Sequence, residues 1–99
     1  MGNYILTNKA VEDLSKIWHY TVDVWSATQA DKYYYMLIDS CQELVDEKVF
    51  GKNYHEVDVT ISGFKIGQHI IFYRKVKGNE IEIARILHSR MDLKSRMQE

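Results

Sequence analysis

The last third of the chain constrains the fold most strongly, because it contains three β-like runs in direct succession. The runs are "GFKIG" at 63–67, "HIIFYRKV" at 69–76 and "EIEIARILH" at 80–88. Gly67-Gln68 fits a tight turn between the first two, and Lys77-Gly78-Asn79 fits a hairpin turn between the second and third. The last two runs are apolar on both alternating faces. We therefore expect them in the middle of a sheet that is covered on at least one side.

The first half of the chain shows helical periodicity instead. A short β-prone run, "YILT" at 4–7, comes first, and Thr7 or Asn8 can cap the helix that follows. We expect Glu12 and Asp13 in the first turn of this helix, where the helix dipole favours negative charge. Apolar residues then recur at steps of four and three, which predicts an amphipathic helix of about five turns. Its predicted apolar stripe consists of Ala10, Leu14, Ile17, Thr21 and Val24, broadened by Val11, Trp18 and Trp25.

A second helix is predicted to start near Ala27. Ser26 and Gln29 have the spacing of a capping box, and Trp25 and Ala30 that of a hydrophobic staple. We interpret Trp18 and Trp25 as core anchors between helix and sheet. So short a connection predicts that the two helices pack as an antiparallel hairpin. The apolar face of the second helix comprises Ala30, Tyr33 or Tyr34, Leu37, Cys41, Leu44 and Val45.

The segment from 46 to 62 is predicted to be a loop, with possible extended structure at 57–61. The order β, α, α, β, β, β then predicts one α+β domain over residues 1–99. In this fold an antiparallel-rich twisted sheet packs against the antiparallel helical hairpin.

Cysteine content and hydropathy bear on the compartment. Cys41 is the only cysteine, so no internal disulfide can form, and the chain does not open with a charged and then apolar leader. No apolar run approaches the roughly 20 residues that span a bilayer. We therefore expect a cytoplasmic protein with no membrane partner.

The charge is almost balanced overall but unevenly distributed. The formal net charge of −1 argues against a domain held on nucleic acid by a general basic field, so no direct sequence-specific nucleic-acid binding is expected. Residues 1–62 carry five Lys and ten Asp or Glu, a net of −5, whereas residues 63–99 carry eight Lys or Arg and four acids, a net of +4. The basic half either attracts an acidic or amphipathic partner or is simply a solvated face.

Metal and cofactor sites are not expected. His19, His55, His69 and His88 are scattered without HxxxH spacing, and no CxxC pair is present. Cys41 lies on the predicted core stripe, so we interpret it as a small buried hydrophobe rather than a nucleophile. The chain has no GxGxxG or GxxxxGK[ST] phosphate loop.

Four polar residues at the end of the sheet have two interpretations. As a catalytic group they would hold a phosphodiester, with Arg steadying the developing charge and His or Tyr acting as acid or base. Alternatively Arg85 is hydrogen-bonded to an acid or to loop carbonyls, while His88 and Asp92 cap the chain as it leaves the sheet. The residues alone favour this second interpretation. The four residues are Tyr73, Arg74, Arg85 and His88.

Longer segments resemble a known family. "ISGFKIGQHIIFYRK" followed by "IEIARILHSRMD" is similar to the C-terminal signature of the ParE branch of the RelE/ParE toxin superfamily. "YILTNKAVEDLSKIWHYT" resembles the opening strand and first helix of that family, and "QADKYYYMLIDSCQEL" its second helix. The following "DEKVFGK" departs from the pattern, because the family often has proline and glycine there and this chain has Gly51 alone.

This resemblance implies a toxin of a type II toxin–antitoxin module. ParE toxins stabilise the cleaved DNA complex of DNA gyrase and are silenced by a ParD-like antitoxin. The C-terminal segment of that antitoxin folds along the toxin, partly as a helix in an apolar groove. Such a toxin acts by binding, so no catalytic residues and no cofactor are expected. The residues then expected to contact partners are Lys65, Arg74, Arg85, His88, Arg90, Met91 and Asp92.

Two alternatives remain open. A RelE-like toxin cuts mRNA in the ribosome and needs several Lys or Arg side chains on the open sheet face. The other alternative is an inactive interaction domain of the same fold. If the chain were a ribonuclease, its site would comprise Arg74, Arg85, His88 and Tyr73.

Overall fold

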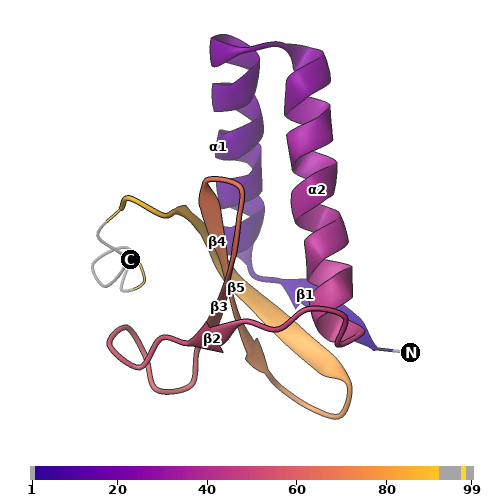
Figure 1. The fold of residues 1–99 in the computed structure, drawn as a ribbon, viewed down its shortest axis with the longest axis vertical. Coiled ribbons are helices and arrows are strands. Elements are labelled where there is room, and N and C mark those ends of the chain that lie inside the picture. Colours follow the sequence, from indigo (N-terminus) through magenta and orange to yellow (C-terminus); the bar gives the residue numbers. More distant parts are fainter. Residues whose placement is uncertain (1, 92–96, 98–99) are drawn as a thin grey trace.

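The computed structural model describes residues 2–91 and 97, and in these residues it has two helices and five strands. Figure 1 shows the helices side by side as an antiparallel hairpin that rises from the sheet. The α+β fold and the order of its elements are as predicted, with one additional short strand. In chain order the elements are β1 (Asn3–Leu6), α1 (Asn8–Val24), α2 (Ala27–Val45), β2 (Lys52–Asn53), β3 (Ser62–Ile66), β4 (His69–Lys75) and β5 (Glu80–His88).

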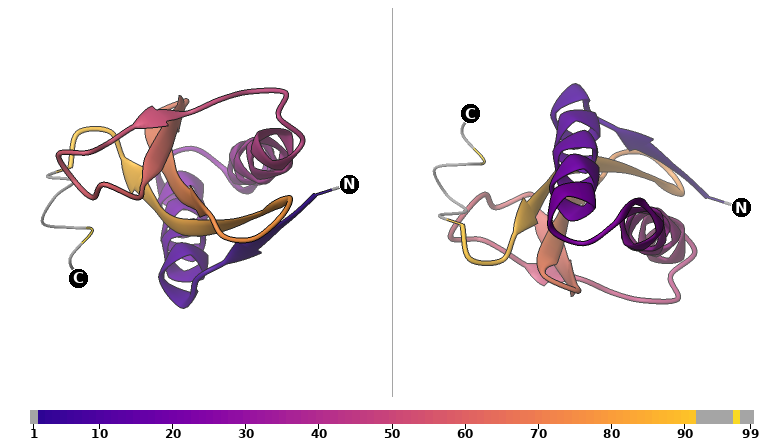
Figure 2. Two further views of the ribbon diagram at one scale, coloured as in Figure 1. Left: turned by 90° about the horizontal axis from the view of Figure 1, so that it is seen from below. Right: turned by 90° about the horizontal axis from the view of Figure 1, so that it is seen from above.

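The sheet has the strand order β1-β5-β4-β3-β2. β1 pairs with β5 in parallel, and the other neighbours are antiparallel. β4 and β5 therefore lie inside the sheet, which confirms the prediction from their two apolar faces. Seen along the helices, the strands curve around the end of α2 (Figure 2).

Both helices begin at the predicted caps. The Thr7 hydroxyl accepts a hydrogen bond from the Ala10 amide at 3.1 Å, and the Ser26 hydroxyl accepts one from the Gln29 amide at 3.0 Å. The first turn of α1 contains no acidic residue. The expectation that Glu12 and Asp13 lie there is therefore wrong, because the helix begins at Asn8 and both residues fall in its second turn.

Apolar side chains form one core on each face of the sheet. The core under the helical hairpin includes Leu14, Leu37, Cys41 and Ile83. On the other face Tyr54 and Ile61, from the segment between β2 and β3, pack with strand residues, and Met97 packs against them. Cys41 is fully buried, and this burial raises the pKa of its thiol to about 12, as suits a core residue.

Two sequence expectations about the core and the loop are wrong. Residues 57–61 form turns, and the strand of this region is Lys52–Asn53. Trp25 is 73% exposed, so it does not anchor the core, whereas Trp18 is half-buried and its Nε1 donates to Asp31 at 2.9 Å. Neither of the two helices in the described part of the chain is long and apolar enough to cross a membrane.

Candidate functional site

Arg85 lies inside β5 and is buried against α1. Its Nε donates to Asp13 Oδ2 at 2.8 Å and its Nη2 donates to Asp13 Oδ1 at 3.0 Å, a bidentate pair. The two residues are 9% and 7% exposed. The interpretation in which Arg85 is hydrogen-bonded to an acid is confirmed. The guanidinium lies between strand and helix, so little of the Arg85 side chain is accessible to a partner.

A β-bulge brings Arg85 into this position. Phe72 pairs with Arg85 but the next residue, Tyr73, pairs with Ile83, so Ala84 is an extra residue on β5. A bulge of this kind bends the strand and redirects its side chains. The register of β5 beyond the bulge is therefore displaced by one residue relative to the part near the hairpin turn.

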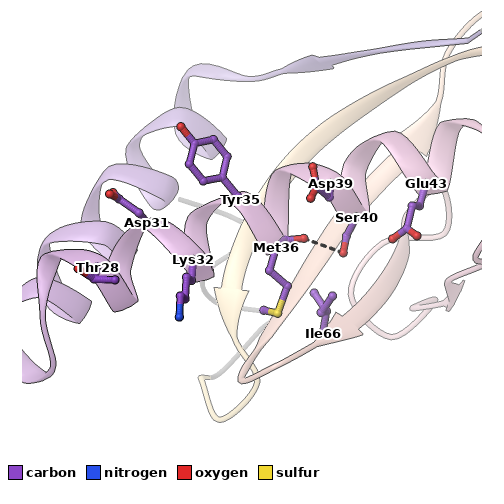
Figure 3. Close-up of a pocket in the computed structure, with 9 residues that line it drawn as sticks. All are labelled: Thr28, Asp31, Lys32, Tyr35, Met36, Asp39, Ser40, Glu43 and Ile66. Atoms are coloured by element: carbon purple, nitrogen blue, oxygen red, sulfur yellow. Dashed lines mark hydrogen bonds between the residues drawn. The ribbon is translucent and has the colours of Figure 1, made fainter.

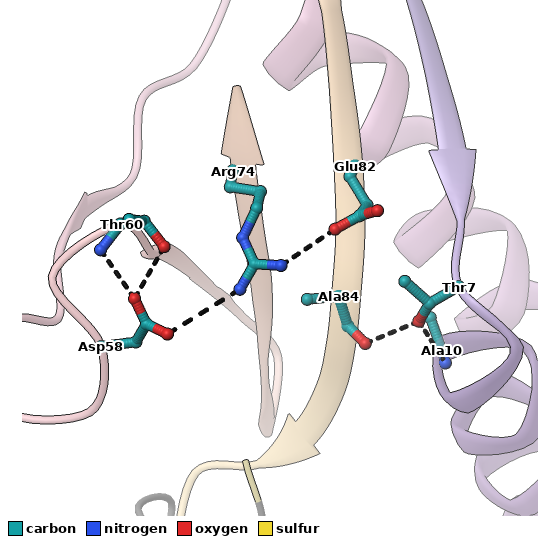
Figure 4. Close-up of polar contacts among 7 residues, drawn as sticks. All are labelled: Thr7, Ala10, Asp58, Thr60, Arg74, Glu82 and Ala84. Atoms are coloured by element: carbon teal, nitrogen blue, oxygen red, sulfur yellow. Dashed lines mark hydrogen bonds and ion pairs between the residues drawn. The ribbon is translucent and has the colours of Figure 1, made fainter. Parts of the chain in front are cut away.

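The start of α1 supplies hydrogen-bond partners where β1 ends. Pairing of β1 with β5 stops at Ile83. Beyond it, the Thr7 hydroxyl donates to the Ala84 carbonyl at 2.8 Å (Figure 4), and the Ile86 amide donates to Asp13 Oδ2 at 3.0 Å. The start of α1 thus supplies the hydrogen-bond partners that a neighbouring strand would otherwise give to the end of β5.

Arg74 holds the segment between β2 and β3 on the sheet. Its Nη1 donates to Glu82 at 3.0 Å on the opposing strand, and its Nη2 lies 4.0 Å from Asp58 (Figure 4). Asp58 also accepts hydrogen bonds from the hydroxyl and the amide of Thr60, and these bonds, with Arg74, lower the pKa of its carboxyl. The Arg74 side chain remains 34% exposed, so it is a partly accessible cation with a structural role.

The residues predicted for a ribonuclease do not come together. Tyr73 is buried, and its hydroxyl accepts a hydrogen bond from the Gly51 amide at 2.9 Å. Arg74 pairs with Glu82, whereas His88 lies six residues further along β5. At roughly 3.3 Å per residue this separation is about 20 Å. The expectation that the four side chains meet is wrong.

A pair of histidines instead lies where β4 begins and β5 ends. His69 pairs with His88, and their ring centroids are 5.3 Å apart. The Tyr33 hydroxyl lies 2.6 Å from His69 Nδ1 and accepts the Gln68 amide at 3.0 Å. Burial, and then the neighbouring His88, lower the pKa of His69 to about 4. His88 Nδ1 accepts the Arg90 amide at 3.1 Å, which confirms that His88 caps the chain as it leaves the sheet.

An open cavity of about 620 Å³ adjoins this histidine pair. The turn between the helices, the turn between β3 and β4 and the end of β5 form its walls. Sequence reasoning assigned no functional role to Trp25 or His69, because their position here depends on where α1 ends and on the bulge in β5. The lining residues are Tyr20, Thr21, Trp25, Gln29, Tyr33, Gln68, His69, His88 and Arg90.

A second cavity, of about 720 Å³, runs along α2 (Figure 3). Met36 points from the helix toward Ile66 of β3, whereas the Tyr35 ring points to the other side of α2. Met36 and Ile66 are half-buried and supply apolar surface to this cavity, and the Tyr35 ring, which is 61% exposed, also lines it. Its full lining is Thr28, Asp31, Lys32, Tyr35, Met36, Asp39, Ser40, Glu43 and Ile66.

The other predicted contact residues lie in two places. Lys65 is exposed on β3, whereas Arg90 and Met91 are exposed just beyond β5. Asp92 lies outside the described residues. Within residues 2–91 and 97, no group of three or more His, Cys, Asp or Glu side chains is placed to hold a metal ion.

Comparison with known proteins gives the family. The family described as "ParE toxin of type II toxin-antitoxin system, parDE" matches residues 4–93. The chain belongs to the ParE toxin family. It is therefore the toxin of a type II toxin–antitoxin system, and a toxin of this kind has an antitoxin as partner.

Relatives of this ParE toxin match it over nearly their whole length. Toxin ParE1 of Mycobacterium tuberculosis (strain ATCC 25618 / H37Rv) is 30% identical over 92 residues, covering 93% of this chain and 94% of the relative. Toxin ParE1 of Caulobacter vibrioides is 28% identical over 97 residues, covering 98% and 99%. A solved structure titled "Chromosomal ParDE TA system from P. aeruginosa" superposes with a TM-score of 0.71 at 26% identity, covering 89% of this chain and 95% of that one. The predicted RelE/ParE toxin fold is confirmed.

Proposed function

We propose that this ParE toxin inhibits DNA gyrase by binding it and stabilising its cleaved DNA complex. One observation carries the proposal: two of the residues that a ribonuclease would need are buried and bonded within the fold. Arg85 is buried against Asp13, and Tyr73 is buried with its hydroxyl bonded to the Gly51 amide. General acid–base catalysis requires such groups within hydrogen-bond reach of one substrate. Their dispersal favours binding over turnover, and a toxin that binds gyrase acts in the cytoplasm.

We further propose that a ParD-like antitoxin neutralises the toxin by seating a helix in the cavity along α2. Tyr35, Met36 and Ile66 offer the apolar surface that an amphipathic helix needs in a groove. An antitoxin segment that continues past β3 would reach Lys65, which is exposed there. We assign His88, Arg90 and Met91, at the end of β5, to the target surface. Arg74 lies toward the other end of the β4–β5 pair and is proposed as a separate, partly exposed contact, and Asp92 as a further contact residue.

Induced expression in cells tests the target. Gyrase poisoning should trigger the SOS response and convert plasmid DNA to linear molecules, and co-expression of the antitoxin should restore growth. A copy with an early stop codon is the control for the burden of expression. Arrested translation with unchanged plasmid supercoiling would instead favour the RelE-like ribonuclease, and healthy growth would favour an inactive interaction domain.

A further inference from the structure

The cavity at the closed end of the helical hairpin is rimmed by exposed aromatic side chains. Trp25 is 73% exposed and Tyr20 is 67% exposed, and both line the cavity. Large aromatic residues at a concave site are typical anchors of protein interfaces, where Trp, Tyr and Arg dominate the binding energy. The aromatic rim therefore offers apolar contact area that folding leaves in water.

The histidines of the cavity act as hydrogen-bond donors. His88 Nδ1 accepts the Arg90 amide, so the hydrogen of the neutral ring is on Nε2. The Tyr33 hydroxyl accepts the Gln68 amide and lies 2.6 Å from His69 Nδ1. In the His69 tautomer whose Nδ1 accepts the hydroxyl hydrogen, the ring hydrogen is again on Nε2. With its pKa lowered to about 4, His69 stays neutral at pH 7.

The charges of the cavity favour an anionic partner. Its lining, among the described residues, includes the guanidinium of Arg90 and no carboxylate, and the amides of Gln29 and Gln68 add further donors. The cavity along α2 has the opposite balance, with three acidic side chains and one lysine. The two cavities adjoin at the β3–β4 turn, since Ile66, just before the turn, lines one cavity and Gln68, within the turn, lines the other. Their partners are expected to differ in charge.

We propose that the cavity at the closed end of the hairpin receives an acidic segment of the toxin's protein target. A carboxylate of this segment is held by Arg90 and the two imidazoles, while a neighbouring apolar side chain packs on Trp25. A protein segment fits better than DNA, because a duplex needs several cations along its backbone and this chain has a net charge of −1. The inference rests on the proposed function for the identity of the target as gyrase.

Two substitutions with matched controls test the proposal. Trp25→Ala removes the aromatic anchor, and Phe50→Ala removes an equally exposed aromatic ring, at 74%, from the loop after α2. Arg90→Glu reverses the charge in the cavity, and Lys77→Glu makes the same change in the exposed β4–β5 turn. Trp25→Ala and Arg90→Glu should each raise the toxin concentration for half-inhibition of purified gyrase by about 30-fold, which corresponds to the ~2 kcal/mol of an interface hot spot. The controls should stay near wild type, and all four variants should keep wild-type affinity for the antitoxin, which also shows that they fold.

Other outcomes would overturn the proposal. The proposal is wrong if Trp25→Ala and Arg90→Glu both inhibit gyrase as strongly as the wild type. It is also wrong if both variants lose affinity for the antitoxin together with inhibition, because the cavity would then belong to the antitoxin. Loss of binding to a labelled DNA duplex without gyrase would indicate a nucleic acid as the occupant. If the wild-type toxin leaves gyrase active, the proposed function fails, and growth arrest by the same variants becomes the test. Selective loss of arrest in Trp25→Ala and Arg90→Glu would then support the cavity as the target surface, and full arrest would overturn it.

Discussion

Arg85 shows how a charged side chain is accommodated inside an apolar strand. The two carboxylate oxygens of Asp13 accept from its guanidinium, and one of them also accepts the Ile86 amide. Such a buried pair compensates for the loss of hydration only while both partners are present. The pair therefore ties the second turn of α1 to β5.

Removal of the acid should be strongly destabilising. Asp13→Ala leaves the buried guanidinium without its carboxylate, and we expect the free energy of unfolding to fall by about 3–5 kcal/mol. Urea denaturation measures this change. Asp23→Ala, which removes an exposed acid from the same helix, should change the value by no more than about 0.5 kcal/mol. Equal effects of the two substitutions would show that the pair does not stabilise the fold.

His69 gives stability a specific pH dependence. Its pKa is about 4 in the folded protein and 6.5 ordinarily, so between these values the unfolded chain binds a proton that the folded chain does not. The contribution is complete above pH 6.5 and is lost as pH falls toward 4, with a slope of at most about 1.4 kcal/mol per pH unit. His69→Gln should flatten the decline of unfolding free energy between pH 6.5 and 4.5. His55→Gln, at an exposed loop position, should keep the wild-type slope, and identical slopes for all three proteins would contradict the assignment.

Some single residues follow from the sequence and others do not. Cys41 was predicted to be buried because it lies within a long regular stripe, and it is. Trp25 continues the stripe of the first helix in sequence, but α1 ends at Val24 and Trp25 has the non-helical φ and ψ of −122° and −84°. Helical periodicity no longer fixes its direction there. A side chain at a helix end is thus predictable only once the end itself is known.

At the level of elements, the hairpin of β4 and β5 was predictable but its full register was not. Counting outward from the 77–79 turn without a bulge places His69 opposite Leu87, whereas the structure places it opposite His88. The extra residue, Ala84, is stabilised by contact with Thr7 at the start of α1, far away in the sequence. A local pattern cannot indicate a bulge that depends on such a distant contact, so the histidine pair was missed.

The link between α1 and β5 can be measured at Thr7. Its hydroxyl accepts the Ala10 amide and donates to the Ala84 carbonyl, whereas the Ser26 hydroxyl caps only α2. Thr7→Ala should therefore lower the free energy of unfolding by about 2 kcal/mol and Ser26→Ala by about 1 kcal/mol. Thr7→Ser, which keeps the hydroxyl, should restore most of the loss. Equal costs for the two alanine substitutions would argue against the bond to Ala84.

At the scale of the whole molecule, the charge division seen in the sequence bears on the antitoxin. Residues 63–99 carry a net charge of +4, and Lys65 is one exposed member on β3. We expect the dissociation constant for the antitoxin to rise about tenfold between low and high salt, because exposed charges are screened. Isothermal titration calorimetry measures this change, and Lys65→Glu should reduce it. If the affinity does not depend on salt, the basic residues of 63–99 do not attract the antitoxin and form only a solvated face.

The most direct test of binding as the mode of action is a titration of purified toxin into purified gyrase and plasmid DNA. Linear DNA is scored against the ratio of toxin to gyrase, before and after addition of the antitoxin. Binding without turnover predicts that cleaved DNA rises to a plateau near a fixed ratio, does not increase further with time, and falls when the antitoxin is added. An absence of cleaved DNA at any ratio, together with cleavage of ribosome-bound mRNA by catalytic amounts of the same protein, would contradict it.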